Sequence, residues 1–444
     1  MHNLADQIDD LLEREVFGRV TGIQGLLVEI AGPLHLMAVG SRLEVEIDAN
    51  RTVLVEIVGF RPERALCLPY DPLDGMRLGC RAVLIASEAM AKPSDGWLGR
   101  VIDALGRPID GKGLLPPGPN AFDLRAAPPP PANRARVGSP LDLGVRALNT
   151  FVTCCVGQRL GIFAGSGVGK SVLMSMLARN STADVIVIGL IGERGRELQE
   201  FIEDDLGPEG LKRAVVVVAT SDESALMRRQ AAYMAMTMSE YFRGEGKNVL
   251  LMMDSVTRFA MAQREIGLAG GEPPTTKGYT PTVFTELPRL LERAGPGLKG
   301  EGTTTGLFTV LVEGDDHNEP VADAVRSILD GHIVMERAIA ERGRYPAINI
   351  LKSVSRTMPA SVPEYAREIV LRARALLSTF GDMEELIRLG AYRKGSDSDV
   401  DEAIRLNPAL EGFLGQRKGE STSLEEGYQA LSALLEAAPT RDQE

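Results

Sequence analysis

The stretch GIFAGSGVGKSVLM, residues 161–174, contains residue types that bind phosphate. An apolar run leads into a glycine-rich loop, and Lys170, Ser171 and residues that suit a helix follow. Glycines let backbone N–H groups face phosphate oxygens, while Lys170 can reach the β- and γ-phosphates and Ser171 can ligate Mg²⁺. The segment matches the P-loop pattern GxxxxGK[ST], except that Ala164 replaces the first glycine. The alternative is a glycine-rich turn with a surface lysine. The predicted phosphate-binding residues are Gly165, Ser166, Gly167, Val168, Gly169, Lys170, Ser171 and Val172.

The turn GERGRE follows the apolar run VIVIGLI, residues 185–191. The carboxyl end of a parallel strand faces the ligand cleft, so Glu193 in this turn can polarise a water for attack on a phosphate. In the same turn, Arg194 can contact the γ-phosphate or order the loop, and Glu197 can brace it. The alternative is a charged turn whose side chains pair with one another.

Two further charged residues would complete the set that phosphoryl transfer needs. Asp254 ends the run VLLMMD, residues 249–254, where it can hold Mg²⁺ through a bound water together with Ser171. Arg356, in KSVSRT, lies past the last strand-like run, where it could reach the nucleotide of a neighbouring subunit. The alternative for Arg356 is a surface arginine, which the sequence by itself favours.

The composition is that of an ordinary globular protein of two or three domains. The chain has 444 residues, and its net charge of −12 argues against a general nucleic-acid or anionic-membrane surface. Its four cysteines include no CxxC pair and there are only four histidines, which argues against a zinc site and favours buried thiols in a reducing cytoplasm. The acidic N-terminus lacks the apolar segment of a secretory signal, and no run is long enough to span a membrane.

Changes in residue composition and hydrophobic pattern along the sequence predict that the chain has four parts. Residues 1–15 suit an amphipathic helix, either folded back on its own domain or docked on a partner. Residues 16–95 contain short Val-, Leu- and Ile-rich strands typical of a small β-barrel. Residues 96–358 alternate apolar strands with helices, as in a parallel α/β sheet, and include a proline-rich extended connection at 114–140. Residues 359–444 read as amphipathic helices, with a disordered tail.

Several of these segments can be assigned in more detail. The strand-like runs are VIVIGLI, AVVVVA, VLLMMD and LFTVLV. The helix predicted over residues 224–242 is rich in methionine, which indicates core packing. EYAREIVLRARALLSTF and DMEELIRLGA are predicted to form separate helices in the C-terminal part, followed by DVDEAIRLN and SLEEGYQALSALLEA.

The motifs together resemble one family. AGSGVGKS, GLIGERGRE, LLMMDSVTRFAMAQREIGLAGGEPPTTKGYTPTVF and RYPAINILKSVSR resemble the ATPases that power type III protein export. WLGRVIDALGRPIDG is also similar to the catalytic subunit of rotary ATP synthases, the wider family. The resemblance covers residues from about Val16 to about Ala437, and GYTPTVF and EGDDHNEPVADAVRSILDGHIV look closest to the flagellar branch.

The resemblance implies an α/β fold with a RecA-like P-loop ATPase core, a six-stranded N-terminal β-barrel and a C-terminal helical domain. It implies a homohexamer that binds ATP and Mg²⁺ at subunit interfaces. Glu193 would be the catalytic carboxylate and Arg356 the arginine supplied in trans. Tyr345 of RYPAI would stack on adenine, and Arg258 of DSVTR would lie near the γ-phosphate.

The resemblance also implies partners and a location. The N-terminal helix would bind a stator-like regulator, and the pore-facing loop 265–279 would grip a central stalk protein or substrate. Export chaperones with their substrates and a membrane export gate would be further partners. The ring would be cytoplasmic and peripherally associated with the inner membrane, unloading and unfolding export substrates.

Other functions stay open at the level of sequence. A virulence injectisome ATPase is the nearest alternative. A rotary ATP synthase catalytic subunit predicts an acidic C-terminal lever motif, which this sequence lacks. An RNA-translocating hexameric helicase predicts a barrel rich in exposed aromatic and basic residues. Residues 16–87 offer only Phe17, Phe60 and Tyr70, so no nucleic-acid partner is expected. A noncatalytic nucleotide-holding scaffold predicts the loss of Glu193 or Lys170, and both are present.

Overall fold

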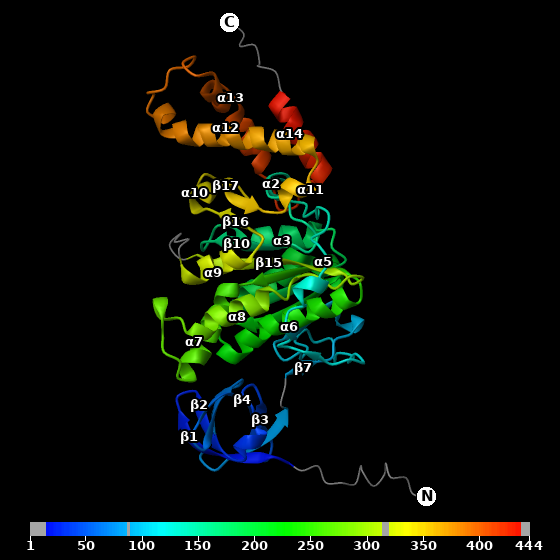
Figure 1. The fold of residues 1–444 in the computed structure, drawn as a ribbon, viewed down its shortest axis with the longest axis vertical. Coiled ribbons are helices and arrows are strands. Elements are labelled where there is room, and N and C mark those ends of the chain that lie inside the picture. The colour runs from blue at the N-terminus through cyan, green and yellow to red at the C-terminus, as the bar shows by residue number, and fades with distance from the viewer. Residues whose placement is uncertain (1–14, 87–88, 313–318, 437–444) are drawn as a thin grey trace, which may run out of the picture.

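The computed structural model describes residues 15–86, 89–312 and 319–436, so the helix expected at the N-terminus lies outside the described residues. The described chain forms three parts that follow one another along the long axis of the molecule (Figure 1). A β-barrel lies at one end, an α/β sheet with its helices is in the middle, and a group of helices lies at the other end.

The first part is a closed six-stranded barrel with strand order β1-β2-β5-β4-β3-β6. Its strands pair antiparallel, and alternate residues point inward. In β3, for example, Leu43, Val45 and Ile47 are buried while the residues between them are not. The barrel implied by the family resemblance is therefore confirmed. Its strands are β1 Phe17–Gln24, β2 Leu27–Ala31, β3 Arg42–Asp48, β4 Arg51–Arg61, β5 Arg64–Pro69 and β6 Arg81–Ala86.

The middle part is built on one sheet with strand order β17-β16-β10-β15-β13-β11-β12-β8. The pairs from β16 to β8 are parallel, and the central strands are buried on both faces, which explains their continuous apolar runs. The four strands expected from such runs are confirmed as β11, β12, β13 and β15. The strands are β8 Arg100–Asp103, β10 Arg159–Ala164, β11 Val185–Glu193, β12 Ala214–Thr220, β13 Asn248–Asp254, β15 Thr303–Leu311, β16 Gly331–Met335 and β17 Ile348–Ser355.

The expected parallel sheet also contains two antiparallel pairs. The edge strand β17 pairs antiparallel with β16, and the two-residue strand β14, Gly295–Pro296, pairs antiparallel with β15. Since β17 reads INILKSVS and leaves Leu351, Lys352 and Val354 exposed, it lacks the apolar run of a central strand. The reversed direction of β17 determines the position of Arg356, the residue that follows this strand.

Helices cover both faces of this sheet. One face carries α2 and α3, and the other carries α6 to α9. The methionines of α6 are buried, which confirms the core role predicted for this helix. The bounds are α2 Arg146–Phe151, α3 Lys170–Asn180, α4 Gly195–Glu200, α5 Gly207–Lys212, α6 Ala225–Gly244, α7 Val256–Ala269, α8 Pro281–Leu291, α9 Pro320–Ile328 and α10 Arg337–Glu341, with a π-helical turn at Phe201–Leu206.

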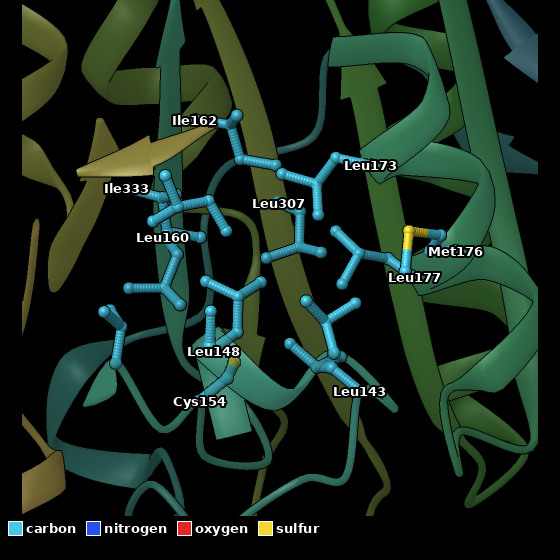
Figure 2. Packing of buried hydrophobic residues seen from close by; sticks show 14 of the residues in the cluster. Leu143, Leu148, Cys154, Leu160, Ile162, Leu173, Met176, Leu177, Leu307 and Ile333 are labelled. Carbon is cyan, nitrogen blue, oxygen red and sulfur yellow. The ribbon is translucent and has the colours of Figure 1, made fainter. Parts of the chain in front are cut away.

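Figure 2 shows how the face with α3 is packed. Leu173 and Leu177 of α3 point toward Ile162 and Leu307 of the sheet, with Leu148 of α2 below them. All five side chains are fully buried. The core therefore fixes the position of α3, and with it the first residues of this helix, relative to β10.

The third part consists of α11 Met358–Ser361, α12 Glu364–Arg388, α13 Ser398–Leu414 and α14 Leu424–Glu436. The prediction of separate helices for EYAREIVLRARALLSTF and DMEELIRLGA was wrong, because α12 continues through both for 25 residues. Gly381 lies inside α12 and costs only about 1 kcal/mol relative to alanine. The helix ends just before Gly390, whose φ of 70° is the left-handed conformation typical of a helix C-terminus.

The proline-rich connection follows the surface of the middle part. It contains the short strand β9, Phe122–Asp123, which pairs with β7, Met90–Ala91. Farther along, the Arg134 guanidinium donates hydrogen bonds to the carbonyl oxygens of Glu292 at 2.5 Å and Ala294 at 3.0 Å. The segment is thereby fastened to the end of α8.

Candidate active site

The glycine-rich loop connects β10 to α3 at the carboxyl edge of the sheet. Gly167 and Gly169 have φ values of 78° and 86°, in the left-handed region that favours glycine. Val168 between them is buried and anchors the loop, and Lys170 begins the helix. Ala164 is the last residue of β10 and its methyl group lies in the core, so an alanine is accommodated at this position.

The three charged residues predicted for catalysis meet beside this loop. Lys170 Nζ forms an ion pair with the Asp254 carboxylate and lies 3.5 Å from Glu193 Oε1. Their side chains are 11%, 7% and 20% exposed, respectively. The Thr309 hydroxyl donates a 2.6 Å hydrogen bond to Asp254 Oδ1 and orients that carboxylate. Strands β11 and β13, whose ends carry the two acids, are neighbours in the sheet.

The electrostatics of this group suit the assigned roles. Burial lowers the pKa of Lys170, but the negative charges of Asp254 and Glu193 outweigh it, so the net pKa is raised and the lysine stays charged. Burial raises the pKa of Glu193, the Lys170 charge opposes this and Asp254 adds to it, and the net pKa is raised. A carboxylate with a raised pKa is a better general base toward water.

A cavity of about 720 Å³ opens over the glycine-rich loop and Glu193. Three arginines line it. Arg194 is largely exposed and its Nη1 donates to Glu197 Oε1 at 3.2 Å. Arg258 lies in the first turn of α7 and packs beside Gly192, and its Nε is buried without a hydrogen-bond partner among the described residues. Arg337 Nη2 donates to the carbonyl oxygen of Ser166 at 3.3 Å.

A second cavity, of about 1010 Å³, lies on the other side of the start of α3. Gly169 and Val172 line both cavities, so the two are adjacent. Tyr345 is 45% exposed here and its ring lies beside Gly169, where an added Cβ would come within 3.2 Å of it. An exposed aromatic face next to a phosphate loop is suited to stacking a nucleotide base. The two cavities together can hold a nucleotide from base to γ-phosphate.

Arg356 lies near the amino-terminal ends of the parallel strands, whereas the glycine-rich loop lies at their carboxyl ends. It follows β17, which runs antiparallel to β16, and its N–H donates to the carbonyl oxygen of Asp330 at 3.0 Å. The Asp330 carboxylate in turn accepts hydrogen bonds from Arg159 at the start of β10. Lys170 comes after the end of β10, a strand about 16 Å long. The structure therefore separates Arg356 from the Lys170 of its own chain.

The residues at this site fit a magnesium ion. Ser171, Glu193 and Asp254 line a small cavity of about 100 Å³ behind the loop, so hydroxyl and carboxylate oxygens converge there. Mg²⁺ prefers oxygen ligands and usually binds through one or two protein groups plus phosphate and waters. The described residues contain no group of three or more His, Cys, Asp or Glu side chains that could hold a metal, and this type of site does not need one.

Sequence reasoning missed two contributors to the site. Arg337 follows β16, a strand of five residues that gave no clear signal. Thr309 lies on an expected strand, and since Met253 pairs with Phe308, the parallel register places Thr309 beside Asp254. That contact could have been found only with the strand order in hand.

Comparison with known proteins decides the family. Residues 144–355 match the model of the ATP synthase alpha/beta family, nucleotide-binding domain. Over 442 residues, the chain is 59% identical to a flagellum-specific ATP synthase of Caulobacter vibrioides, covering 98% of this chain and 100% of the relative. This chain belongs to the flagellar branch of the type III export ATPases. It is a P-loop ATPase.

Further relatives of this flagellar ATPase support the same family assignment. Flagellum-specific ATP synthases of Bacillus subtilis and Salmonella typhimurium are 49% and 46% identical over 97% and 94% of the chain, covering 98% and 93% of the relatives. Residues 362–433 match the T3SS EscN ATPase C-terminal domain. The match at this end supports an export ATPase over a rotary catalytic subunit.

Solved structures show the same architecture. The assembled ATPase EscN from the type III secretion system of enteropathogenic E. coli superposes with a TM-score of 0.89 at 42% identity, covering 94% of this chain and all of that one. EscN in complex with its central stalk EscO gives a TM-score of 0.86 at 41% identity, with the same coverage.

Among the described residues, none of the helices is long and apolar enough to cross a membrane.

Proposed function

We propose that this flagellar ATPase acts as a homohexameric ring that hydrolyses ATP at subunit interfaces and energises export of flagellar proteins. The observation that carries the proposal is that the charged groups lie at opposite ends of the parallel strands. Lys170, Glu193 and Asp254 meet at one end, whereas Arg356 lies at the other. A neighbouring subunit that presents its Arg356 to this site would complete it.

Each residue has a role in the proposed reaction. The backbone N–H groups of residues 165–169 and the Lys170 ammonium bind the phosphates, and Lys170 exchanges its ion pair with Asp254 for the nucleotide. Glu193 accepts a hydrogen bond from the attacking water and orients it in line with the γ-phosphate. Arg258 and the neighbour's Arg356 stabilise the charge that develops on the transferred group, and Arg194 orders the turn.

The base and the metal are held by separate groups. Tyr345 stacks on adenine in the larger cavity. Ser171 and Asp254 would hold Mg²⁺, the latter through a bound water. The ion, when bound, neutralises charge on the β- and γ-phosphates.

The proposal extends to partners. EscN has been solved with a central stalk protein, which supports a stalk partner for the loop 265–279 here. We further propose that a regulator binds the N-terminal segment and that export chaperones deliver substrates to the ring. We place the ring in the cytoplasm beside the export gate of the inner membrane, where it would unload and unfold substrates.

The test is ATPase activity as a function of protein concentration, for wild type and for Glu193→Ala, Lys170→Ala and Arg356→Ala. We expect specific activity to rise with concentration and all three variants to be inactive. Mixing Arg356→Ala with Lys170→Ala subunits should restore part of the activity, because some interfaces then pair an intact Lys170 with an intact Arg356. Full activity of Arg356→Ala, or activity independent of concentration, would overturn the shared site while leaving the P-loop assignment intact.

A further inference from the structure

Residues 415–420, in the loop between α13 and α14, form part of the wall of the cavity around Tyr345. The Gln416 N–H donates to the carbonyl oxygen of Tyr345 at 2.8 Å. The buried Gln416 amide is held in turn, since its Oε1 accepts from the Arg146 N–H and its Nε2 donates to the Gly144 carbonyl oxygen, both at 2.8 Å. The position of this C-terminal loop is thereby tied to the position of Tyr345.

The same loop also contacts the segment that follows Glu193 in the chain. Lys418 Nζ forms an ion pair with Asp205 in the π-helical turn Phe201–Leu206. The Asp205 side chain is 14% exposed, and that of Lys418 is 40% exposed. The Arg179 guanidinium, from the end of α3, donates to the carbonyl oxygens of Asp204 and Asp205. The turn is therefore fastened both to the P-loop helix and to the C-terminal loop.

The π-helical turn forms part of the back of the catalytic site. Asp205 and Phe201 line the same cavity of about 100 Å³ as Glu193 and Asp254. The turn connects to Glu193 through the short helix α4. Single π-helical turns inside helices are frequent at functional sites. A displacement of this turn would change the wall against which the Glu193 side chain rests.

We propose that Lys418 and Asp205 are positioning residues that couple the cavity around Tyr345 to the catalytic carboxylate of Glu193. When the loop 415–420 closes with Tyr345 on a base, the Lys418–Asp205 pair holds the π-helical turn, and with it Glu193, in the hydrolytic arrangement. This inference rests on the roles proposed for Tyr345 and Glu193. It adds that nucleotide binding and hydrolytic competence are linked through the C-terminal domain by a single ion pair.

Charge reversal tests the pair. Lys418→Asp and Asp205→Lys should each lower kcat about five-fold in the full-length protein, because a partly buried charge then faces a like charge. Because Lys418 lines the larger cavity and Asp205 lines the small cavity behind the loop, the affinity for a fluorescent ADP analogue must be measured alongside. A loss of kcat clearly larger than any loss of ADP affinity is expected of positioning residues, and equal losses in both would contradict the proposal. The exchanged double variant should recover kcat to within about two-fold of wild type, and Lys418→Arg should retain it.

A matched control pair lies on the next helix. Glu209 and Lys212 of α5 form a 2.6 Å ion pair but are both highly exposed, so reversing either should leave kcat unchanged. Lys418→Met removes the charge without adding a like charge and should give a smaller loss in the same direction. Wild-type kcat in both reversals, or a double variant no better than the worse single one, would overturn the proposal.

Failure of this inference can be told apart from failure of the proposed function. Glu193→Gln should be inactive yet bind the ADP analogue if the catalytic assignment is right. If Glu193→Gln is inactive while Lys418→Asp and Asp205→Lys turn over normally, only the coupling is wrong. If Glu193→Gln turns over normally, the catalytic assignment itself fails.

Discussion

At the scale of single residues, Arg337 contributes a charge to the phosphate cavity that the sequence did not reveal. It lies at the start of α10 and donates to the carbonyl oxygen of Ser166. We expect Arg337→Ala to raise the KM for ATP about five-fold and to change kcat much less, because an exposed charge-assisted contact contributes of the order of 1 kcal/mol. Steady-state kinetics would measure this. Arg196→Ala is the control, since Arg196 is almost fully exposed on α4, and an equal effect there would contradict the assignment.

Glu223 is a second residue with a measurable signature. Burial, with the nearby charges of Asp103 and Asp222, raises the pKa of its carboxyl to about 7 from an ordinary 4.5. Between these values the folded state binds more protons than the unfolded state, so stability falls as pH rises through this window. After allowance for solvent screening, the loss is of the order of 1 kcal/mol.

The corresponding experiment compares urea unfolding at pH 5 and pH 8. Glu223→Gln should be more stable than wild type at pH 8 and should lose less stability between the two pH values, because it has no charge to bury. Glu209→Gln, on the exposed face of α5, should follow the wild-type pH dependence. A wild-type pH dependence in Glu223→Gln would mean that another group causes the fall.

At the scale of elements, α6 joins the barrel to the sheet domain through a buried ion pair. Arg229 of α6 lies 2.5 Å from Glu56 of β4, both side chains are 4% exposed, and the Tyr70 hydroxyl also donates to this carboxylate. We expect Arg229→Ala to lower the free energy of unfolding by about 3–5 kcal/mol, because it leaves Glu56 buried without its counter-ion.

Replacing both partners separates this cause from lost packing. The double variant Arg229→Met with Glu56→Leu should be less destabilised than Arg229→Ala alone, since no unpaired charge remains. Urea denaturation of the three proteins would measure the difference. Equal losses in the single and double variants would indicate that packing, and not the orphaned charge, dominates.

The elements also show what the sequence could and could not predict. The central strands β11, β12, β13 and β15 were predictable because burial on both faces requires long apolar runs. The edge strands β8 and β17 were not, because four residues or a half-exposed face give little signal. For the same reason the reversed direction of β17, which places Arg356, came only from the structure.

The residues of the site also fall into a group that could be predicted from the sequence and a group that could not. Lys170, Glu193 and Asp254 were predictable because each lies next to a strand end or in a motif with fixed spacing. The contacts made by Thr309 and Gln416 were not, because they join segments 55 and 71 residues apart or more, which only strand order and domain packing bring together. The spacing of 71 is the difference between positions 416 and 345.

At the scale of the whole molecule, the two end domains are attached differently. The barrel has a core of its own, made of residues such as Ile30, Leu43 and Val55. In contrast, the C-terminal helices share one continuous core with α3 and the sheet, to which Leu377 and Leu410 contribute. The helical domain therefore completes the core that holds the P-loop helix, whereas the barrel adds Leu66, Leu68 and Tyr70 to the core on the opposite face of the sheet.

Truncation would distinguish the two kinds of attachment. A chain of residues 89–444, without the barrel, should melt at a lower temperature but still cooperatively and should bind a fluorescent ADP analogue, because it loses Leu66, Leu68 and Tyr70 from one core but keeps the core around α3 and both nucleotide cavities. A chain of residues 1–361, without α12 to α14, should lose cooperative melting, because the buried faces of Phe151 and Leu148 would be opened to water. Circular dichroism during heating and equilibrium binding would measure both. If residues 1–361 melted cooperatively and bound the analogue as the full chain does, the helical domain would be an independent appendage, and the coupling proposed for Lys418 would have no mechanical basis.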